Sequence, residues 1–210
     1  MCASYGLQIP VGQFEDLFQI NDRTSLADIE RWLEEHGSET VKPTGRIMKN
    51  LNPIIRGTEA GRTAELAWWG YLIGGVPSKF PSINTRSERL QDKPSLLKGR
   101  ALAPASEWYE FQKPSKERWA FDTGEPFAIA VVTQSGKPAD GDPVTCYSLV
   151  MQPARSDLEY IHDRMPLLIP TSFFDEWLDP DAVPSRELID AALDAGREMS
   201  ALVSAHPVSR

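Results

Sequence analysis

Residues 100–111, RALAPASEWYEF, are the stretch of sequence that decides the fold. Apolar residues dominate this stretch, and its three aromatic residues are typical of β-strands. Comparable runs bounded by Pro, Gly or Asp lie at residues 65–73, 126–133 and 144–152. We therefore expect strands in the middle of the chain.

Helices are expected towards both ends of the chain. Residues 25–37 begin with a serine cap, carry apolar residues at helical spacing and end at a glycine. Further helices are predicted over residues 171–178 and 185–200. The pattern has no repeating βαβ rhythm, so it predicts an α+β fold with a largely antiparallel, barrel-like sheet and peripheral helices. No linker divides the sequence, and we expect one domain over residues 1–210.

The composition excludes several classes of protein. The 210 residues carry a net charge of −8, with 41% hydrophobic and 25% charged residues, as in globular proteins. The sequence contains no apolar run of about 18 residues and no secretory signal, so no membrane association is expected. Two cysteines make no disulfide framework and favour a reducing, cytoplasmic location. The negative charge argues against a protein that coats nucleic acid indiscriminately.

The charge is distributed unevenly along the sequence. Residues 42–118 hold 14 Lys and Arg against 7 Asp and Glu, a net of +7, whereas the remainder carries −15. Chance clustering on solvated faces is one explanation. The other is a basic binding surface formed by the middle of the chain on an acidic body.

No cofactor or metal motif is present. The phosphate-binding glycine motifs and the nucleophile elbow are missing, so no cofactor is expected. The histidines His36, His162 and His206 are far apart, and neither cysteine belongs to a CxxC pair. We therefore expect no metal site.

Cys2 is the most informative single residue. Removal of Met1 would leave a free α-amine beside the thiol, and both groups have reactive forms near neutral pH. The amine can condense with an aldehyde, and the thiol can then close a thiazolidine ring. The same residue could instead attack an acyl group, or could merely follow Met1 by chance.

Three other polar positions are candidates for a site. His162 lies in a polar segment between two apolar stretches, where it serves either a structural network or chemistry. Glu110 lies among aromatic residues, where burial would raise the pKa of its carboxyl, unless it is a surface carboxylate. In residues 84–88, NTRSE, Arg86 could bind a phosphate or pair with Glu88.

The ordered set of these motifs resembles the SOS-response-associated peptidase (SRAP) family. The matching segments follow the same order and spacing over essentially the whole chain. They are residues 1–2, 69–70, 84–88, 99–100, 105–111, 162–166 and 206–209.

The resemblance implies a sensor of abasic sites in single-stranded DNA that forms a thiazolidine crosslink through Cys2. Asn84 would hold the N-terminal residue, Glu110 would act as acid and base, and His162 would help to open the abasic sugar. Closure of the ring removes the imine and so protects the strand from β-elimination. An autoproteolytic peptidase activity and a lyase-type activity are also implied.

The resemblance also implies a positively charged cleft for DNA in a compact, barrel-like fold. Arg86 and Arg164 would bind the phosphates beside the lesion, and Arg46, Pro53 and Arg89 are further candidate contacts. A cytoplasmic monomer, associated with the nucleoid when bound to DNA, is expected.

The sequence departs from the family pattern at three places. Ala3-Ser4 replaces the usual Gly-Arg, so a phosphate contact is either lost or supplied by another residue. Residues 72–77 lack the tryptophan that often follows the Trp-Gly strand, and residues 45–53 replace a shorter segment. Two alternative functions therefore stay open: an N-terminal-nucleophile peptidase acting on peptides, and a non-covalent binder of single-stranded DNA.

Overall fold

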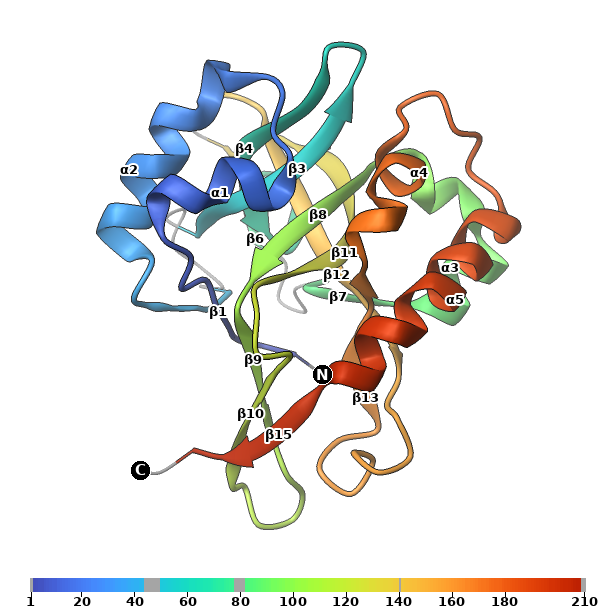
Figure 1. Ribbon diagram of the computed structural model, residues 1–210. Coiled ribbons are helices and arrows are strands. Elements are labelled where there is room, and N and C mark those ends of the chain that lie inside the picture. The colour runs from blue at the N-terminus through green and yellow to red at the C-terminus, as the bar shows by residue number, and fades with distance from the viewer. Residues whose placement is uncertain (1, 44–49, 78–81, 140, 209–210) are drawn as a thin grey trace.

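Five strands close into a barrel at the centre of the protein, as the computed structural model shows (Figure 1). The structure describes residues 2–43, 50–77, 82–139 and 141–208. The barrel strands are β3 (Leu51–Thr58), β4 (Gly61–Trp69), β8 (Arg100–Ala105), β11 (Phe127–Gly136) and β12 (Val144–Pro153). They follow the order β12, β4, β3, β8 and β11, and β11 pairs again with β12. The predicted α+β fold with a barrel-like sheet is confirmed.

One seam of the barrel is parallel and the other four are antiparallel. The parallel seam joins β4 to β12, with Trp68 opposite Cys146 and Trp69 opposite Tyr147. Parallel neighbours need a long connection, and residues 70–143 form it. The barrel therefore closes only when segments far apart in the sequence meet.

Alternate side chains of the barrel strands belong to two separate hydrophobic clusters. Ile55 and Leu102 pack in an outer cluster, which also contains buried residues of the helices. Ile54 and Ala103, their neighbours in sequence, belong to an interior cluster together with Cys2. Because successive side chains of a strand point to opposite faces, the interior cluster fills the barrel and the outer one lies under the helices.

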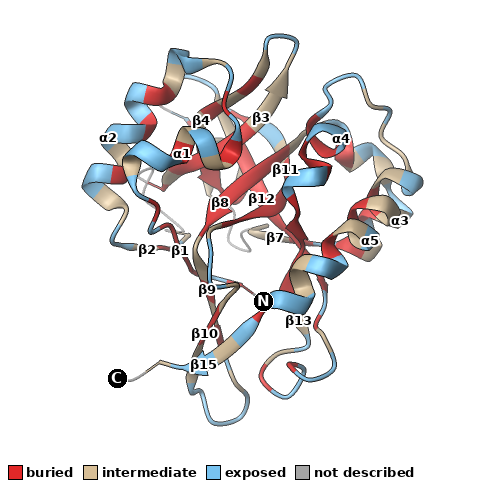
Figure 2. Cartoon of the chain, in the orientation of Figure 1, coloured by how far each residue is buried: buried red, intermediate tan, exposed pale blue. Residues whose placement is uncertain are grey.

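The helices surround the barrel and turn their buried faces towards it (Figure 2). They are α1 (Val11–Phe18), α2 (Leu26–His36), α3 (Ser87–Asp92), α4 (Phe174–Leu178) and α5 (Arg186–Leu202). Short 3-10 turns lie at Arg23–Ser25, Pro94–Lys98 and Thr171–Phe173. The three predicted helices are confirmed as α2, as α4 with the turn before it, and as α5, where the Ser185 hydroxyl accepts a hydrogen bond from the Leu188 N–H.

A second, antiparallel sheet brings the start of the chain to the barrel. Its strands, in the order of pairing, are β15 (Ser204–Pro207), β10 (Arg118–Asp122), β9 (Glu107–Phe111), β1 (Tyr5–Gly6) and β2 (Thr40–Val41). Tyr5 lies opposite Trp108, and the Tyr109 N–H donates to the Ser4 carbonyl. β9 therefore holds the chain from Ser4 onwards, shortly after Cys2.

Short strands extend both edges of β12 near its carboxyl end. β7 (Asn84–Arg86) runs parallel to it, and β13 (Arg164–Pro166) runs antiparallel on the other edge. β14 (Leu168–Ile169) pairs with β11, and β5 (Leu72–Ile73) and β6 (Val76–Pro77) form a separate hairpin. β12 thus places Asn84, Arg86 and Arg164 around one end of the barrel.

The structure divides two of the predicted strands. The run at 100–111 breaks at Ser106, because the chain leaves the barrel there and enters the second sheet. The run at 65–73 breaks at Gly70, whose φ of 103° favours glycine. β3 was not predicted, because its Asn52-Pro53 pair resembles a turn.

Candidate active site

Cys2 is completely buried at the end of the barrel that faces β9. Its thiol lies 3.5 Å from the Ser4 carbonyl oxygen, and its own carbonyl accepts a hydrogen bond from the side chain of Asn84. Burial raises the pKa of the thiol well above its usual range, and the charge of Glu110 adds to this shift. The free thiol is therefore protonated, and thiolate forms only when another group takes the proton.

Asn84 lies at the start of β7 and reaches the backbone of Cys2. The amide Nδ2 donates to the Cys2 carbonyl at 2.7 Å. Its Oδ1 is buried and accepts no hydrogen bond from the part of the chain that the structure describes. Asn84 thus contacts the N-terminal residue, as the role assigned to it requires, and leaves an acceptor inside the site.

Glu110 points inward from β9, and only 4% of it is exposed. Burial raises the pKa of its carboxyl to about 7. At neutral pH the side chain therefore exists in both protonation states. A carboxyl with this pKa can donate and accept protons under physiological conditions.

His162 lies beside Glu110 on the segment that connects β12 and β13. Its Nε2 is 3.9 Å from Glu110 Oε2, and the Arg164 N–H donates to its Nδ1 at 3.0 Å. This backbone contact assigns the proton of the neutral ring to Nε2, on the side of Glu110. Burial lowers the pKa of His162, whereas the Asp163 carboxylate, 3.1 Å from Nδ1, acts in the opposite direction.

The arginines predicted to bind phosphate differ in their surroundings. Arg86 in β7 and Arg89 in α3 are exposed, and within the described ranges neither forms an ion pair. Arg164 in β13 is half-buried, and its Nη1 lies 2.6 Å from Glu88 Oε1. Glu88 therefore pairs with Arg164 and leaves Arg86 available for an anion.

The two remaining predicted DNA contacts, Arg46 and Pro53, are not seen beside Arg86, Arg89 and Arg164. Arg46 lies outside the described residues. Pro53 is buried in β3 opposite Leu66, so a contact between its side chain and DNA would require a rearrangement. The role of both residues stays a prediction.

Part of the positive charge in residues 42–118 serves the fold. Arg62 is buried, donates to Gln19 and Asp175, and lies 5.2 Å from the centre of the Phe174 ring. Arg100 donates to backbone carbonyls, among them those of Leu97 and Trp177. The count of basic residues therefore overstates the charge that this segment offers to DNA.

The whole chain, residues 1–210, matches the family model described as SOS response associated peptidase (SRAP). The chain belongs to the SRAP family. It is 26% identical over 183 residues to the abasic site processing protein YoqW of Bacillus subtilis, and the match covers 80% of each chain. It is 30% identical over 152 residues to the abasic site processing protein YedK of Escherichia coli, covering 68% of this chain and 66% of YedK.

Solved structures share the fold of this SRAP protein. A protein from Bacteroides thetaiotaomicron superimposes with a TM-score of 0.74 at 16% identity, covering all of this chain and 93% of that one. A phage-related protein from Bordetella bronchiseptica gives a TM-score of 0.69 at 22% identity, covering 100% and 95%. At these identities the likeness shows the fold alone.

Two features of this SRAP chain were not found from the sequence. The hydroxyls of Tyr5 and Tyr147 lie 2.8 Å apart inside the barrel, in the same cluster as Cys2. A tyrosine within an apolar run indicates a buried hydroxyl that needs a hydrogen-bond partner. The sequence does not reveal that partner, because 142 residues separate Tyr5 from Tyr147. Arg155, which holds the segment carrying His162, gave no signal in the sequence.

The described residues form neither a metal site nor a membrane-spanning helix. No group of three or more His, Cys, Asp or Glu side chains within the described ranges could hold a metal ion. Among the same residues, no helix combines the length and apolar character needed to span a membrane.

Proposed function

We propose that this SRAP protein recognises abasic sites in single-stranded DNA and crosslinks to them through the α-amine and thiol of Cys2, once Met1 has been removed. The observation that carries the proposal is the grouping of Cys2, Asn84, Glu110 and His162 at one end of the barrel. The names of YoqW and YedK, abasic site processing proteins, support the choice of substrate.

The burial of Cys2 favours a fixed order of bond formation. A protonated thiol is a poor nucleophile, whereas a free α-amine has a pKa of about 7.7–8.0. The amine therefore attacks C1′ of the ring-opened sugar first, and loss of water gives an imine. The sulfur then adds to the same carbon while its proton passes to the nitrogen, which closes the thiazolidine without any oxidant or reductant.

Glu110 and His162 supply the proton transfers that this sequence requires. A carboxyl with a pKa of about 7 can protonate the departing hydroxyl during imine formation and take a proton at the next step. The His162 ring, whose Nε2–H is directed towards Glu110, would assist the proton transfers that open the sugar to its aldehyde. Removal of Met1 by the same groups would account for the peptidase in the family name.

The test uses single-stranded DNA that carries one abasic site. Intact mass spectrometry should show protein without Met1 joined to DNA with the loss of one water. A strand with a tetrahydrofuran abasic analogue is the matched control, because it cannot open to an aldehyde and should form no adduct. A duplex with the same lesion tests the preference for single strands.

Cys2→Ser keeps the amine and removes the thiol. It should give an imine that borohydride traps, but no adduct that survives denaturation unaided. An adduct with the tetrahydrofuran strand, or a stable adduct with Cys2→Ser, would overturn the proposal. Cleavage of unrelated peptides by the wild type, without any adduct, would favour the peptidase instead.

A further inference from the structure

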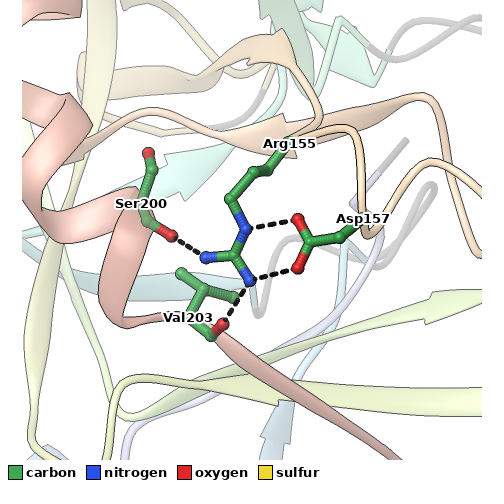
Figure 3. Close-up of polar contacts among 4 residues, drawn as sticks. All are labelled: Arg155, Asp157, Ser200 and Val203. Carbon is green, nitrogen blue, oxygen red and sulfur yellow. Dashed lines mark hydrogen bonds and ion pairs between the residues drawn. The ribbon is translucent and has the colours of Figure 1, made fainter.

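The segment that carries His162 is fixed to the end of helix α5 by Arg155. Figure 3 shows the Arg155 guanidinium between the segment and the helix. Nη1 donates to the Ser200 carbonyl at 2.5 Å, and Nη2 donates to the Val203 carbonyl at 3.0 Å. Nε and Nη2 also donate to the two carboxylate oxygens of Asp157, at 2.5 and 2.9 Å. One side chain thus joins the segment to a helix terminus and closes a turn within the segment.

An arginine suits this position for two reasons. The carbonyls at the C-terminal end of a helix carry partial negative charge, and the last turn of α5 has no basic residue of its own. The planar guanidinium can reach the helix carbonyls and a carboxylate together, which a lysine ammonium cannot do in one position. All three of its nitrogens are engaged, so Arg155 is not a phosphate contact.

Hydrogen bonds transmit the position of Arg155 to His162. The Leu158 N–H donates to the Arg155 carbonyl at 2.8 Å, and the His162 N–H donates to the Leu158 carbonyl at 3.3 Å. The Ala154 N–H donates to the Asp163 carbonyl at 3.0 Å and closes the base of the segment. A movement of Arg155 would therefore displace the backbone of His162.

Tyr160 attaches the same segment to the hairpin that holds Glu110. The Gln112 amide donates to the Tyr160 carbonyl at 3.1 Å, and the Tyr160 ring meets Trp119 edge-on with centroids 5.8 Å apart. Trp119 lies opposite Glu110 in the β9–β10 pair. The segment is thus held on one side to the Glu110 hairpin and on the other to α5 through Arg155.

We propose that Arg155 is a positioning residue for His162, so that it sets the geometry in which His162 and Glu110 exchange protons with the substrate. The inference rests on the proposed function for its role in the reaction. Arg155 does not touch the reacting atoms and acts only through the segment that it anchors.

A double-mutant cycle tests the proposal. At saturating abasic DNA, Arg155→Ala should slow crosslink formation by about fivefold to twentyfold, as expected for coupled neighbours. In a His162→Ala background, the same substitution should cause no further loss. Arg155→Lys keeps the positive charge but lacks the planar guanidinium, so it should recover only part of the rate. The same variant replaces Arg155→Ala in the cycle if Arg155→Ala does not fold.

Arg197→Ala is the matched control, because Arg197 lies on α5, the helix that Arg155 contacts, and pairs with Asp194 of the same helix at 2.8 Å. It should leave the rate unchanged. Equal losses from Arg155→Ala with and without His162 would show a general structural effect and overturn the proposal. An unchanged rate in Arg155→Ala would do the same.

A second measurement does not depend on any crosslink. NMR titration of the His162 ring, assigned with His162→Ala, should show a midpoint in Arg155→Ala closer to the ordinary value of about 6.5 than in the wild type. An unchanged midpoint would contradict the positioning role. If the wild type forms no adduct, the proposed function fails while this titration still decides whether Arg155 positions His162.

Discussion

The two ends of the barrel both present basic residues, yet they differ in what they bury. At one end, where β8 and β12 finish, lie Cys2, Glu110 and His162. At the other, where β8 and β12 begin, Arg56 and Lys98 line a hollow of about 400 Å³ together with hydroxyl and amide side chains. Charge alone therefore does not distinguish the two ends.

The difference lies in the buried titratable groups. Arg56 is partly exposed and pairs with Glu65 at 3.5 Å, and Lys98 is exposed, so the far end holds solvated cations. At the end that holds Cys2, Glu110 is buried, and this burial raises the pKa of its carboxyl to about 7. Burial of an ionisable group costs stability, so it marks a functional site better than surface charge does.

The largest expected effect concerns the two cysteines, which lie towards opposite ends of the barrel. Cys2→Ala should abolish the stable adduct with abasic DNA, whereas Cys146→Ala should leave it unchanged, because Cys146 is buried in β12 opposite Gln134. A denaturing gel measures both. Loss of the adduct in Cys146→Ala, with the protein still folded, would contradict the assignment of the site.

Glu110→Gln should slow crosslink formation by roughly a hundredfold at neutral pH, within the usual range for a general acid or base. In the wild type the rate should fall above pH 7, as the acid form of Glu110 is lost, and fall at lower pH, as the α-amine becomes protonated. Glu110→Gln should lose the fall above pH 7. If the rate of Glu110→Gln still fell above pH 7, Glu110 would not be the group that transfers these protons.

The predicted phosphate contacts should have a smaller effect. Arg86→Ala should weaken binding to single-stranded DNA by about threefold to tenfold. It should also make the slope of the logarithm of the binding constant against the logarithm of the salt concentration shallower by about 0.7, the value for one phosphate contact on single-stranded DNA. Arg164→Ala should have a larger effect, because it also leaves the Glu88 carboxylate without its partner. Binding titrations at several salt concentrations measure both, and equal slopes in wild type and variants would argue against phosphate contacts.

Glu110 should also make stability depend on pH. Its folded pKa, about 7, is above the ordinary value of 4.5, so its stabilising effect is complete below about pH 4.5 and is lost as pH rises through 7. Glu110→Gln removes this loss, on the order of 1–3 kcal/mol. Thermal unfolding should show a greater advantage for the variant at pH 8 than at pH 5. The same advantage at both values would indicate an ordinary folded pKa.

The smallest effect is expected at the far end of the barrel. Lys98→Ala should change neither DNA affinity nor crosslink rate by more than about twofold, because Lys98 lies away from the site and is exposed. The same binding and gel assays apply. A loss as large as that of Arg86→Ala would mean that DNA also contacts this end.

The sequence predicted those strands that consist of a continuous run of apolar side chains. The bounds of β11 and β12 differ from the predicted ones by at most three residues. β3 was missed because Pro53 resembles a turn, although it is tolerated within this strand. Closure of the barrel between β4 and β12 was beyond prediction, because the pairing depends on segments more than 70 residues apart.

The candidate site was predictable as a set of residues but not as a geometry. Chemistry pointed to Cys2, and the position of Glu110 among aromatic residues correctly indicated burial and a raised pKa. The partner of Arg164 could not be predicted, since Glu88 was equally able to pair with Arg86. Contacts of Arg155 with backbone carbonyls leave no trace in the sequence, because any residue can supply a carbonyl.

The pairing of residues 4–6 with β9 has a consequence during synthesis. The hydrogen bond from the Tyr109 N–H to the Ser4 carbonyl joins residues 105 positions apart, so the first residues stay exposed until β9 has left the ribosome. At 5–20 residues per second, this interval lasts on the order of 5–20 s. Enzymes that act on nascent chains can therefore reach Cys2 before the folded barrel buries it.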